Sequence, residues 1–196
     1  MNIKRSIGIA VIFALILIVV AIFVIGEAKK QRTELPKLFE VPEFTFTERS
    51  GESFGLQDMK GKISVVDFIF TRCPGPCPIM SAQMKELYEI YREYDQVQFV
   101  SFTVDPEYDS LSVLQDYADK FGVDDDRWVF LWAEKPRIET LYEEGFKLGG
   151  ELPYNHSTKF VLVDQEGMIR GYYSTEDEIS LSILQTHLRD LAKSAS

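Results

Sequence analysis

Cysteine and histidine are scarce in this sequence, which contains two of each among 196 residues. An iron–sulfur cluster normally takes four cysteine ligands, so two cysteines exclude a cluster held by this chain alone. A structural zinc site needs four ligands, which would use the entire supply of these two residue types. The sequence also lacks internal repeats and low-complexity tracts. Any chemistry of sulfur or imidazole must therefore come from one small site.

A surplus of basic residues is missing as well. Residues 33–196 contain 16 basic and 30 acidic residues, which gives a net charge of −14. Proteins that bind nucleic acid carry clustered lysine and arginine against the phosphates, so we expect no nucleic acid partner. The acidity fits a cationic partner, a metal ion, or simply a well-solvated surface.

Long apolar runs are confined to the N-terminus, where the 20 residues 7–26 contain no charged side chain. A helix of that length spans about 30 Å, the thickness of a bilayer core, so the run predicts a single transmembrane anchor. A cleaved signal peptide is the alternative, with residues 26–28 as a poor cleavage site and an unusually long apolar region. The anchor implies a short cytoplasmic tail, residues 1–6, and a globular domain on the extracytoplasmic side of the inner (cytoplasmic) membrane.

Two further segments follow the anchor. Residues 27–42 are charged and contain two prolines, which is typical of a tether between membrane and domain. Residues 43–194 are numerous enough for one domain with a hydrophobic core.

The pattern of this domain predicts an α/β fold. Two alternating runs around a glycine-containing turn predict an N-terminal β-hairpin at 44–56. Apolar side chains three and four positions apart predict helices at about 78–94, 114–121 and 138–146, and Thr175 with Glu178 predicts a capping box for a last helix that ends near Lys193. Predicted strands lie at 63–70, 97–104, 128–132, 159–164 and 168–173. This order resembles a thioredoxin-like fold with a mixed sheet and an added hairpin.

Both cysteines lie in the stretch "FIFTRCPGPCPIM", which follows the predicted central strand and leads into a helix. Sites in open α/β sheets usually lie at that edge, where strands end and helices begin. Prolines before and after Cys77 predict that regular helix begins only near Pro78. The helix N-terminus and the neighbouring Arg72 should stabilise a thiolate over a thiol, so we expect Cys73 and Cys77 to be reactive.

Three interpretations of the cysteine pair remain open. A purely structural disulfide would close a loop of about 5 residues and contribute only about 2 kcal/mol, against about 4.7 kcal/mol for a loop near 100 residues. A redox pair fits the position, with one residue more between the cysteines than in the C-x-x-C of thioredoxins. Two thiolates are also soft metal ligands, and Cu(I) needs only two or three such donors.

A third donor is available in "GGELPYNHST", the connection before the strand at 159–164. If that strand enters antiparallel to its neighbours, its start lies at the same sheet edge as the cysteines, and His156 faces them. The alternative is a surface histidine in a loop. His187 instead falls in line with leucines of the last helix and is expected to be a partly buried or surface residue.

The segments "FIFTRCPGPCP", "SFTVDPEYDS" and "NHSTKFVLVDQEG" resemble, in order and spacing, those of the Sco family of membrane-anchored, thioredoxin-like copper proteins. The resemblance covers about residues 40–192 and the anchor. It implies that Cys73, Cys77 and His156 bind copper, as Cu(I) or Cu(II). Asp105, from the family's Asp-Pro-Glu segment, would orient His156 or support a partner contact, unless it is only a turn residue.

The resemblance also implies a function. A protein of this kind would bind one copper ion and deliver it to the copper-receiving subunit of cytochrome c oxidase during assembly. The alternatives are a thiol–disulfide oxidoreductase, in which Cys73 and Cys77 are the redox-active pair, and a docking module with an inert disulfide. The chain departs from the family pattern where many members carry acidic residues: Gly75 and Pro76 lie between its cysteines, and Asn155 precedes its histidine.

Overall fold

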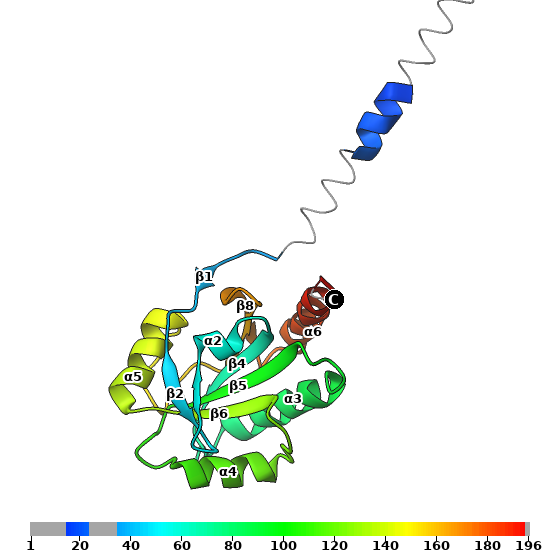
Figure 1. Ribbon diagram of the computed structural model, residues 1–196. Coiled ribbons are helices and arrows are strands. Elements are labelled where there is room, and N and C mark those ends of the chain that lie inside the picture. Colours follow the sequence, from blue (N-terminus) through cyan, green and yellow to red (C-terminus); the bar gives the residue numbers. More distant parts are fainter. Residues whose placement is uncertain (1–14, 24–34, 195–196) are drawn as a thin grey trace, which may run out of the picture. The chain divides into compact units, whose positions relative to one another are not determined.

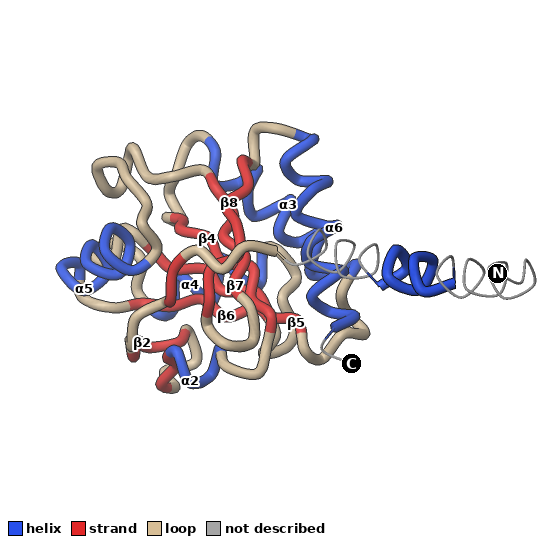
Figure 2. The backbone as a smooth tube through the Cα atoms, turned by 90° about the horizontal axis from the view of Figure 1, so that it is seen from above, coloured by secondary structure: helices blue, strands red, loops and turns tan. Residues whose placement is uncertain are grey.

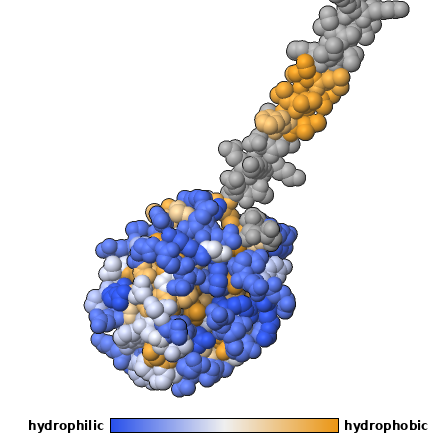
Figure 3. Space-filling model, in the orientation of Figure 1, coloured by the Kyte–Doolittle hydropathy of each residue, from blue (hydrophilic) through white to orange (hydrophobic). Residues whose placement is uncertain are grey.

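The computed structural model describes residues 15–23 and 35–194 of the chain. The chain divides into two units, Met1–Pro36 and Lys37–Ser196. In the first unit, residues 15–23 are helical and expose apolar side chains (Figure 3). None of the helices in the described ranges combines the length and the apolar character needed to cross a membrane. The tail at 1–6 and the flanks of the 7–26 run lie outside the described residues, so the anchor stays a prediction.

The second unit contains an eight-stranded sheet with the strand order β1-β8-β7-β4-β5-β6-β2-β3 (Figure 1). Its strands are β1 (Phe39–Glu40), β2 (Thr45–Glu48), β3 (Ser53–Gly55), β4 (Ile63–Ile69), β5 (Val97–Thr103), β6 (Trp128–Trp132), β7 (Lys159–Val163) and β8 (Met168–Ser174). The strands β4, β5 and β6 are parallel, whereas β7 runs antiparallel to β4. The sheet is therefore mixed, as the sequence predicts.

The helices cover both faces of this sheet. They are α2 (Leu56–Met59), α3 (Pro76–Ile90), α4 (Leu111–Lys120), α5 (Lys135–Thr140), a single π-helical turn η1 (Leu141–Gly145) and α6 (Glu178–Ser194). The helices α3 and α6 lie on one side of the sheet and α5 on the other (Figure 2).

Aromatic side chains fill the core on both faces. On the α3 and α4 face, the ring of Tyr88 packs against Phe99 and Trp128. On the opposite face, Phe68 of β4 packs against Tyr142 and Phe146, with ring centroids 5.0 and 5.3 Å apart. Every residue of β4 and β5 is buried, which explains why most positions of these strands are apolar on both faces.

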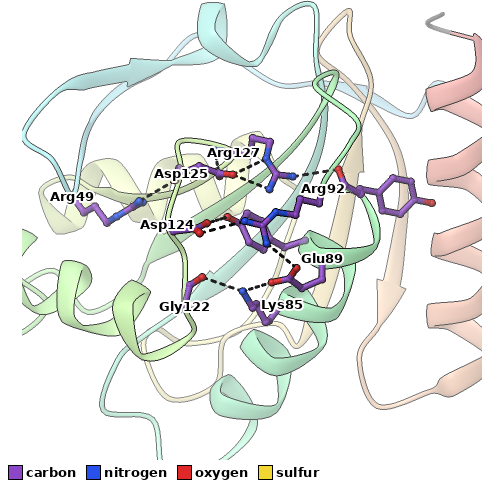
Figure 4. A network of polar contacts seen from close by, with 10 residues as sticks. Arg49, Lys85, Glu89, Arg92, Gly122, Asp124, Asp125 and Arg127 are labelled. Carbon is purple, nitrogen blue, oxygen red and sulfur yellow. Dashed lines mark hydrogen bonds and ion pairs between the residues drawn. The ribbon is translucent and has the colours of Figure 1, made fainter.

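A polar network ties the C-terminal half of α3 to the loop before β6 (Figure 4). Arg92 contacts Glu89 at 3.4 Å and Asp124 at 3.3 Å. Arg127 pairs with Asp125 at 2.8 Å, and its guanidinium lies over the ring of Tyr88. The network fixes the C-terminal end of α3 to the loop before β6; Cys77 lies at the opposite end of this helix.

The structure differs from the sequence predictions at the start of the domain. Residues 37–42 belong to the folded unit rather than to the predicted tether 27–42, whose residues 27–34 lie outside the described part. The reason is that β1 pairs with β8, joining Phe39 to Ile169, and Val41 is fully buried. A strand of two residues leaves no periodic signal that sequence analysis could detect.

Two helix predictions also need correction. The predicted third helix is α5 followed by the wider turn η1. The predicted capping box of the last helix is wrong, because the Thr175 hydroxyl donates to the carbonyl of Thr158 at 2.6 Å. Asp177 caps α6 instead, since its carboxylate accepts from the backbone N–H of Ile179 at 3.0 Å.

Candidate metal centre

Three donor atoms meet where the β4–α3 loop faces the connection that leads into β7. The sulfurs of Cys73 and Cys77 and a ring nitrogen of His156 all lie within 4.8 Å of one another. Nε2 of His156 is 3.2 Å from Sγ of Cys77. The side chains are 9, 0 and 7 % exposed for Cys73, Cys77 and His156, so the donors are recessed but close to the surface.

The cysteines are positioned by the end of β4 and the first turn of α3. The backbone N–H of Cys73 donates to the carbonyl of Phe70 at 3.2 Å, which closes a turn directly after the strand. The helix begins at Pro76 rather than at Pro78, so the predicted start is wrong by two residues. Proline is tolerated there because the first N–H groups of a helix have no partner within the helix. Cys77 therefore lies in the first turn of α3 and points inward.

The histidine is positioned by the antiparallel entry of β7, which the sequence predicts. Because β7 runs antiparallel to β4, with Val65 opposite Leu162, the start of β7 lies beside the end of β4. Nδ1 of His156 lies 3.1 Å from the carbonyl oxygen of its neighbour Ser157. A proton on Nδ1 donates to that carbonyl and leaves the lone pair of Nε2 directed at Cys77.

Tyr142 of η1 closes the connection that carries the histidine. Its hydroxyl donates to the carbonyl of Gly149 at 2.7 Å and accepts from the backbone N–H of Ser157 at 2.6 Å. Gly150 has a φ of +122°, and a side chain there would collide with the carbonyl oxygen of Asn155. Both features hold residues 149–157 in a tight bend with His156 at its inner side.

Burial sets the protonation of the two closest donors in opposite directions. It raises the pKa of the Cys77 thiol well above its ordinary range, and the neighbouring Cys73 adds to the effect. It lowers the pKa of His156, with the Ser157 carbonyl opposing the shift. At neutral pH the metal-free site therefore holds a neutral imidazole, the form that binds metal, and a protonated Cys77.

This result overturns the expected thiolate at Cys77. Arg72 does not supply the positive charge that would stabilise a thiolate. Its Nε donates to the carboxylate of Asp105 at 2.7 Å, and its guanidinium lies 4.6 Å from the ring centre of Tyr108. Asp105 itself is buried, and the contact it makes is with Arg72 rather than with His156. Asp105 thus acts on the position of the side chain of Arg72, the residue before Cys73.

Asp109 is a residue that the sequence analysis missed. Its carboxylate is fully buried and accepts from the Thr71 hydroxyl at 2.5 Å, from the Thr71 N–H at 3.1 Å, and from the Thr103 hydroxyl at 2.5 Å. It therefore fastens the start of the cysteine loop to the end of β5. The sequence feature that could have identified it is the second aspartate of "DPEYDS", which lies four positions after Asp105.

The donor set determines what the site can hold. Two sulfurs and one imidazole are soft to borderline ligands, which suit Cu(I) and do not complete the four-ligand shell of structural zinc. In the described part of the chain no other group of three or more histidine, cysteine or acidic side chains has this geometry. His187 lies apart, half-buried in α6, and its Nδ1 is 2.8 Å from the hydroxyl of Tyr173, as expected for a helix residue without a metal role.

Comparison with known proteins identifies the family. The family model SCO1/SenC matches residues 32–191. The chain belongs to the SCO1/SenC family. Among its relatives, the SCO1 protein homolog of Bacillus subtilis is 33 % identical over 151 residues, which cover 74 % of this chain and 78 % of the relative.

Two solved Sco structures illustrate the match. The structure of BsSco, described as a member of the Sco family of cytochrome c oxidase assembly proteins with a disulfide switch, has a TM-score of 0.72 at 29 % identity, covering 81 % of this chain and 96 % of that one. The structure of yeast Sco1 with copper bound has a TM-score of 0.64 at 21 % identity, covering 79 % and 90 %, and shares the fold. The thioredoxin-like α/β fold with a mixed sheet, expected from the order of the predicted elements, is confirmed.

Proposed function

We propose that this protein is a copper chaperone that binds one copper ion through Cys73, Cys77 and His156 and delivers it during cytochrome c oxidase assembly. The observation that carries the proposal is the convergence of these three donors within 4.8 Å of one another. Copper is the cargo rather than a resident cofactor. The description of BsSco as an oxidase assembly protein and the copper-bound Sco1 of yeast support this choice of metal and process.

Delivery would proceed by ligand exchange at a site close to the surface. Copper binding displaces the proton of Cys77, and the imidazole of His156 contributes its lone pair without releasing a proton. On release, a thiolate of the recipient forms a bond to copper as a bond to Cys73 or Cys77 breaks, so the ion is never free and its oxidation state does not change. The vacated thiolate then takes up a proton.

The recipient in this proposal is the copper-receiving subunit of the oxidase. The apolar run at residues 7–26 would hold the protein in the inner membrane, with residues 37–196 on the extracytoplasmic side where that subunit is assembled.

A pair of histidine variants tests the three-ligand site, because the chain contains only His156 and His187. The full chain in detergent would be loaded with Cu(I) under reducing conditions and analysed for bound copper after passage over a weak chelator. We expect His156→Ala to lose most of its copper and His187→Ala to retain one ion per chain. Stoichiometric copper on His156→Ala would contradict the site.

A second function, thiol–disulfide exchange, is favoured by one observation. Both cysteines are free, and Cys73 is the more accessible of the two. In that reaction the Cys73 thiolate attacks a disulfide of the partner, one partner sulfur leaves as a thiol, and Cys77 then releases the partner by forming the Cys73–Cys77 disulfide. The partner is reduced by two electrons and the pair is oxidised.

Oxidase maturation in cells with Cys73→Ser separates the two functions. Rescue by excess copper alone indicates that delivery is the missing step. Rescue by an external thiol reductant alone indicates that reduction of the recipient is the missing step.

A further inference from the structure

Three exposed apolar side chains belong to the segments that build the candidate metal centre. Tyr154 is 71 %, Ile79 61 % and Tyr108 51 % exposed, which places them among the most exposed large apolar residues of the folded unit. We call them the apolar rim. Each belongs to a different one of the segments that build the site: the start of α3, the turn after β5, and the connection that carries His156.

The rim is continuous with the donors through direct ring contacts. Phe70 packs edge-on against Tyr154 at 5.8 Å and against His156 at 5.7 Å between ring centres. On the other side, Tyr108 lies under the guanidinium of Arg72, the residue before Cys73. Ile79 lies two residues after Cys77 in the first turns of α3. The three side chains therefore lie on the segments that hold the donors, where a partner that reaches the sulfurs must dock.

The two tyrosines are already held in place in the free protein. Phe70 supports the ring of Tyr154, and Arg72, which is itself paired with Asp105, supports the ring of Tyr108. Side chains that are ordered before binding lose little conformational entropy when a partner covers them. Tyrosine is one of the few residue types that carry most of the binding energy of protein interfaces.

The charge of this face differs from that of the rest of the domain. Residues 33–196 carry a net charge of −14, whereas residues 72–79 and 149–156 contain two charged side chains, Arg72 and Glu151. Arg72 is neutralised by Asp105 at 2.7 Å, which leaves Glu107 as the one further charge in the turn at 105–108. A partner that docks here meets a surface with few charges, so complementarity favours an apolar face on the partner that carries no excess of negative charge.

We infer that the apolar rim is the docking surface for the protein that receives the copper, and that this recipient presents an apolar face with no excess of negative charge around its own metal ligands. The inference rests on the proposed function, since only a recipient must reach the sulfurs. Binding energy comes chiefly from Tyr154, Tyr108 and Ile79, and the ligands exchange at the centre of the contact. The acidic surface elsewhere on the domain contributes little to docking.

The test uses the full chain in detergent and the purified soluble copper-receiving domain of the oxidase subunit. The dissociation constant and the rate of copper transfer are measured for the wild type and for Tyr154→Ala and Tyr108→Ala, after bound copper has been counted. Tyr94→Ala is the matched control, because Tyr94 is also exposed, at 41 %, and packs edge-on against a neighbouring aromatic ring, Tyr91. It follows the C-terminal end of α3, away from Cys77.

We expect each rim variant to keep one copper per chain and to weaken docking at least about tenfold, as loss of an aromatic interface anchor does. Tyr94→Ala should match the wild type, and raising the salt concentration from low to high should change the dissociation constant less than about threefold. Unchanged docking by the rim variants, equal loss in Tyr94→Ala, steep salt dependence, or no docking by the wild type would overturn the inference. Failure of the wild type to bind copper would instead overturn the proposed function.

Discussion

Sγ of Cys77 lies 3.2 Å from Nε2 of His156, although 79 positions separate the two residues in the chain. Burial acts on both groups, raising the pKa of the thiol and lowering the pKa of the imidazole. The contact therefore joins a protonated sulfur to a neutral nitrogen, and copper must displace the sulfur's proton to bind.

Copper affinity should consequently depend on pH. Between pH 6 and pH 8 the Cys77 thiol keeps its proton, so each unit of pH should strengthen Cu(I) binding about tenfold through this group alone. The imidazole is already neutral at pH 7 and adds little to the slope. Competition with a Cu(I) chelator of known affinity at several pH values measures it. In the Cys77→Ser variant, the slope of the logarithm of Cu(I) affinity against pH should be smaller by one proton. A wild-type affinity that does not change with pH would disprove the displacement of a proton by copper.

The two histidines offer a direct test of the role of Asp105. No part of the lowered pKa of His156 comes from Asp105, whose carboxylate contacts Arg72. We expect Asp105→Asn to leave the NMR titration of His156 nearly unchanged. Asp190 raises the pKa of His187, so Asp190→Asn should lower it and serves as the positive control. A clear shift of His156 in Asp105→Asn would restore the orienting role expected from the sequence.

Asp109→Ala should loosen the cysteine loop. The change removes three hydrogen bonds and leaves buried partners on Thr71 and Thr103 unsatisfied, which costs about 2–4 kcal/mol of unfolding free energy. Copper should also dissociate faster, because the start of the loop is no longer fastened to β5. Chemical denaturation and chelator-driven copper release measure the two effects. Asp116→Ala, an exposed acid on α4, should behave as the wild type. Equal stability of the two variants would contradict the fastening.

Asp67→Asn should stabilise the protein at alkaline pH. Asp67 lies fully buried in β4, its Oδ1 accepts from Ser101 at 2.6 Å, its Oδ2 has no partner, and burial raises its pKa to about 7. The native state therefore keeps a proton that the unfolded state has already lost, and stability falls as pH rises from about 4 to about 7.

The gain in stability expected for the substitution follows from this raised pKa. An asparagine has no proton to lose, so Asp67→Asn should exceed the wild type by up to about 4 kcal/mol at pH 8 and converge with it near pH 4. Denaturation at both pH values measures the difference. Asp116→Asn should show no such change, and an equal gain for Asp67→Asn at both pH values would contradict a titrating Asp67.

Features that follow from strand direction could be predicted from the sequence. The cysteine loop at the end of a central strand, and the histidine at the start of an antiparallel one, needed only the order of apolar runs and the length of the connection before residue 159. The added hairpin at 44–56 was visible in the same way, and it forms β2 and β3. These inferences depend on backbone topology, which the periodicity of apolar residues encodes.

Features that depend on side-chain burial could not be predicted. The sequence places Arg72 next to Cys73, but it does not show that the guanidinium turns to Asp105 and Tyr108. The protonation of Cys77 depends on its complete burial, which no local sequence pattern indicates. The contribution of Asp109 depends on one hydroxyl from the cysteine loop and one from β5, a convergence that no local pattern reports.

The hydroxyl of Tyr142 bonds to both ends of the bend that carries the histidine, at Gly149 and at Ser157. The residues inside the bend can therefore vary in sequence without displacing the strand that follows. Tyr154 or Asn155 can change during evolution to suit a different copper recipient, while the imidazole of His156 keeps its position beside the sulfurs. The choice of recipient and the binding of copper can thus change independently within a single short segment.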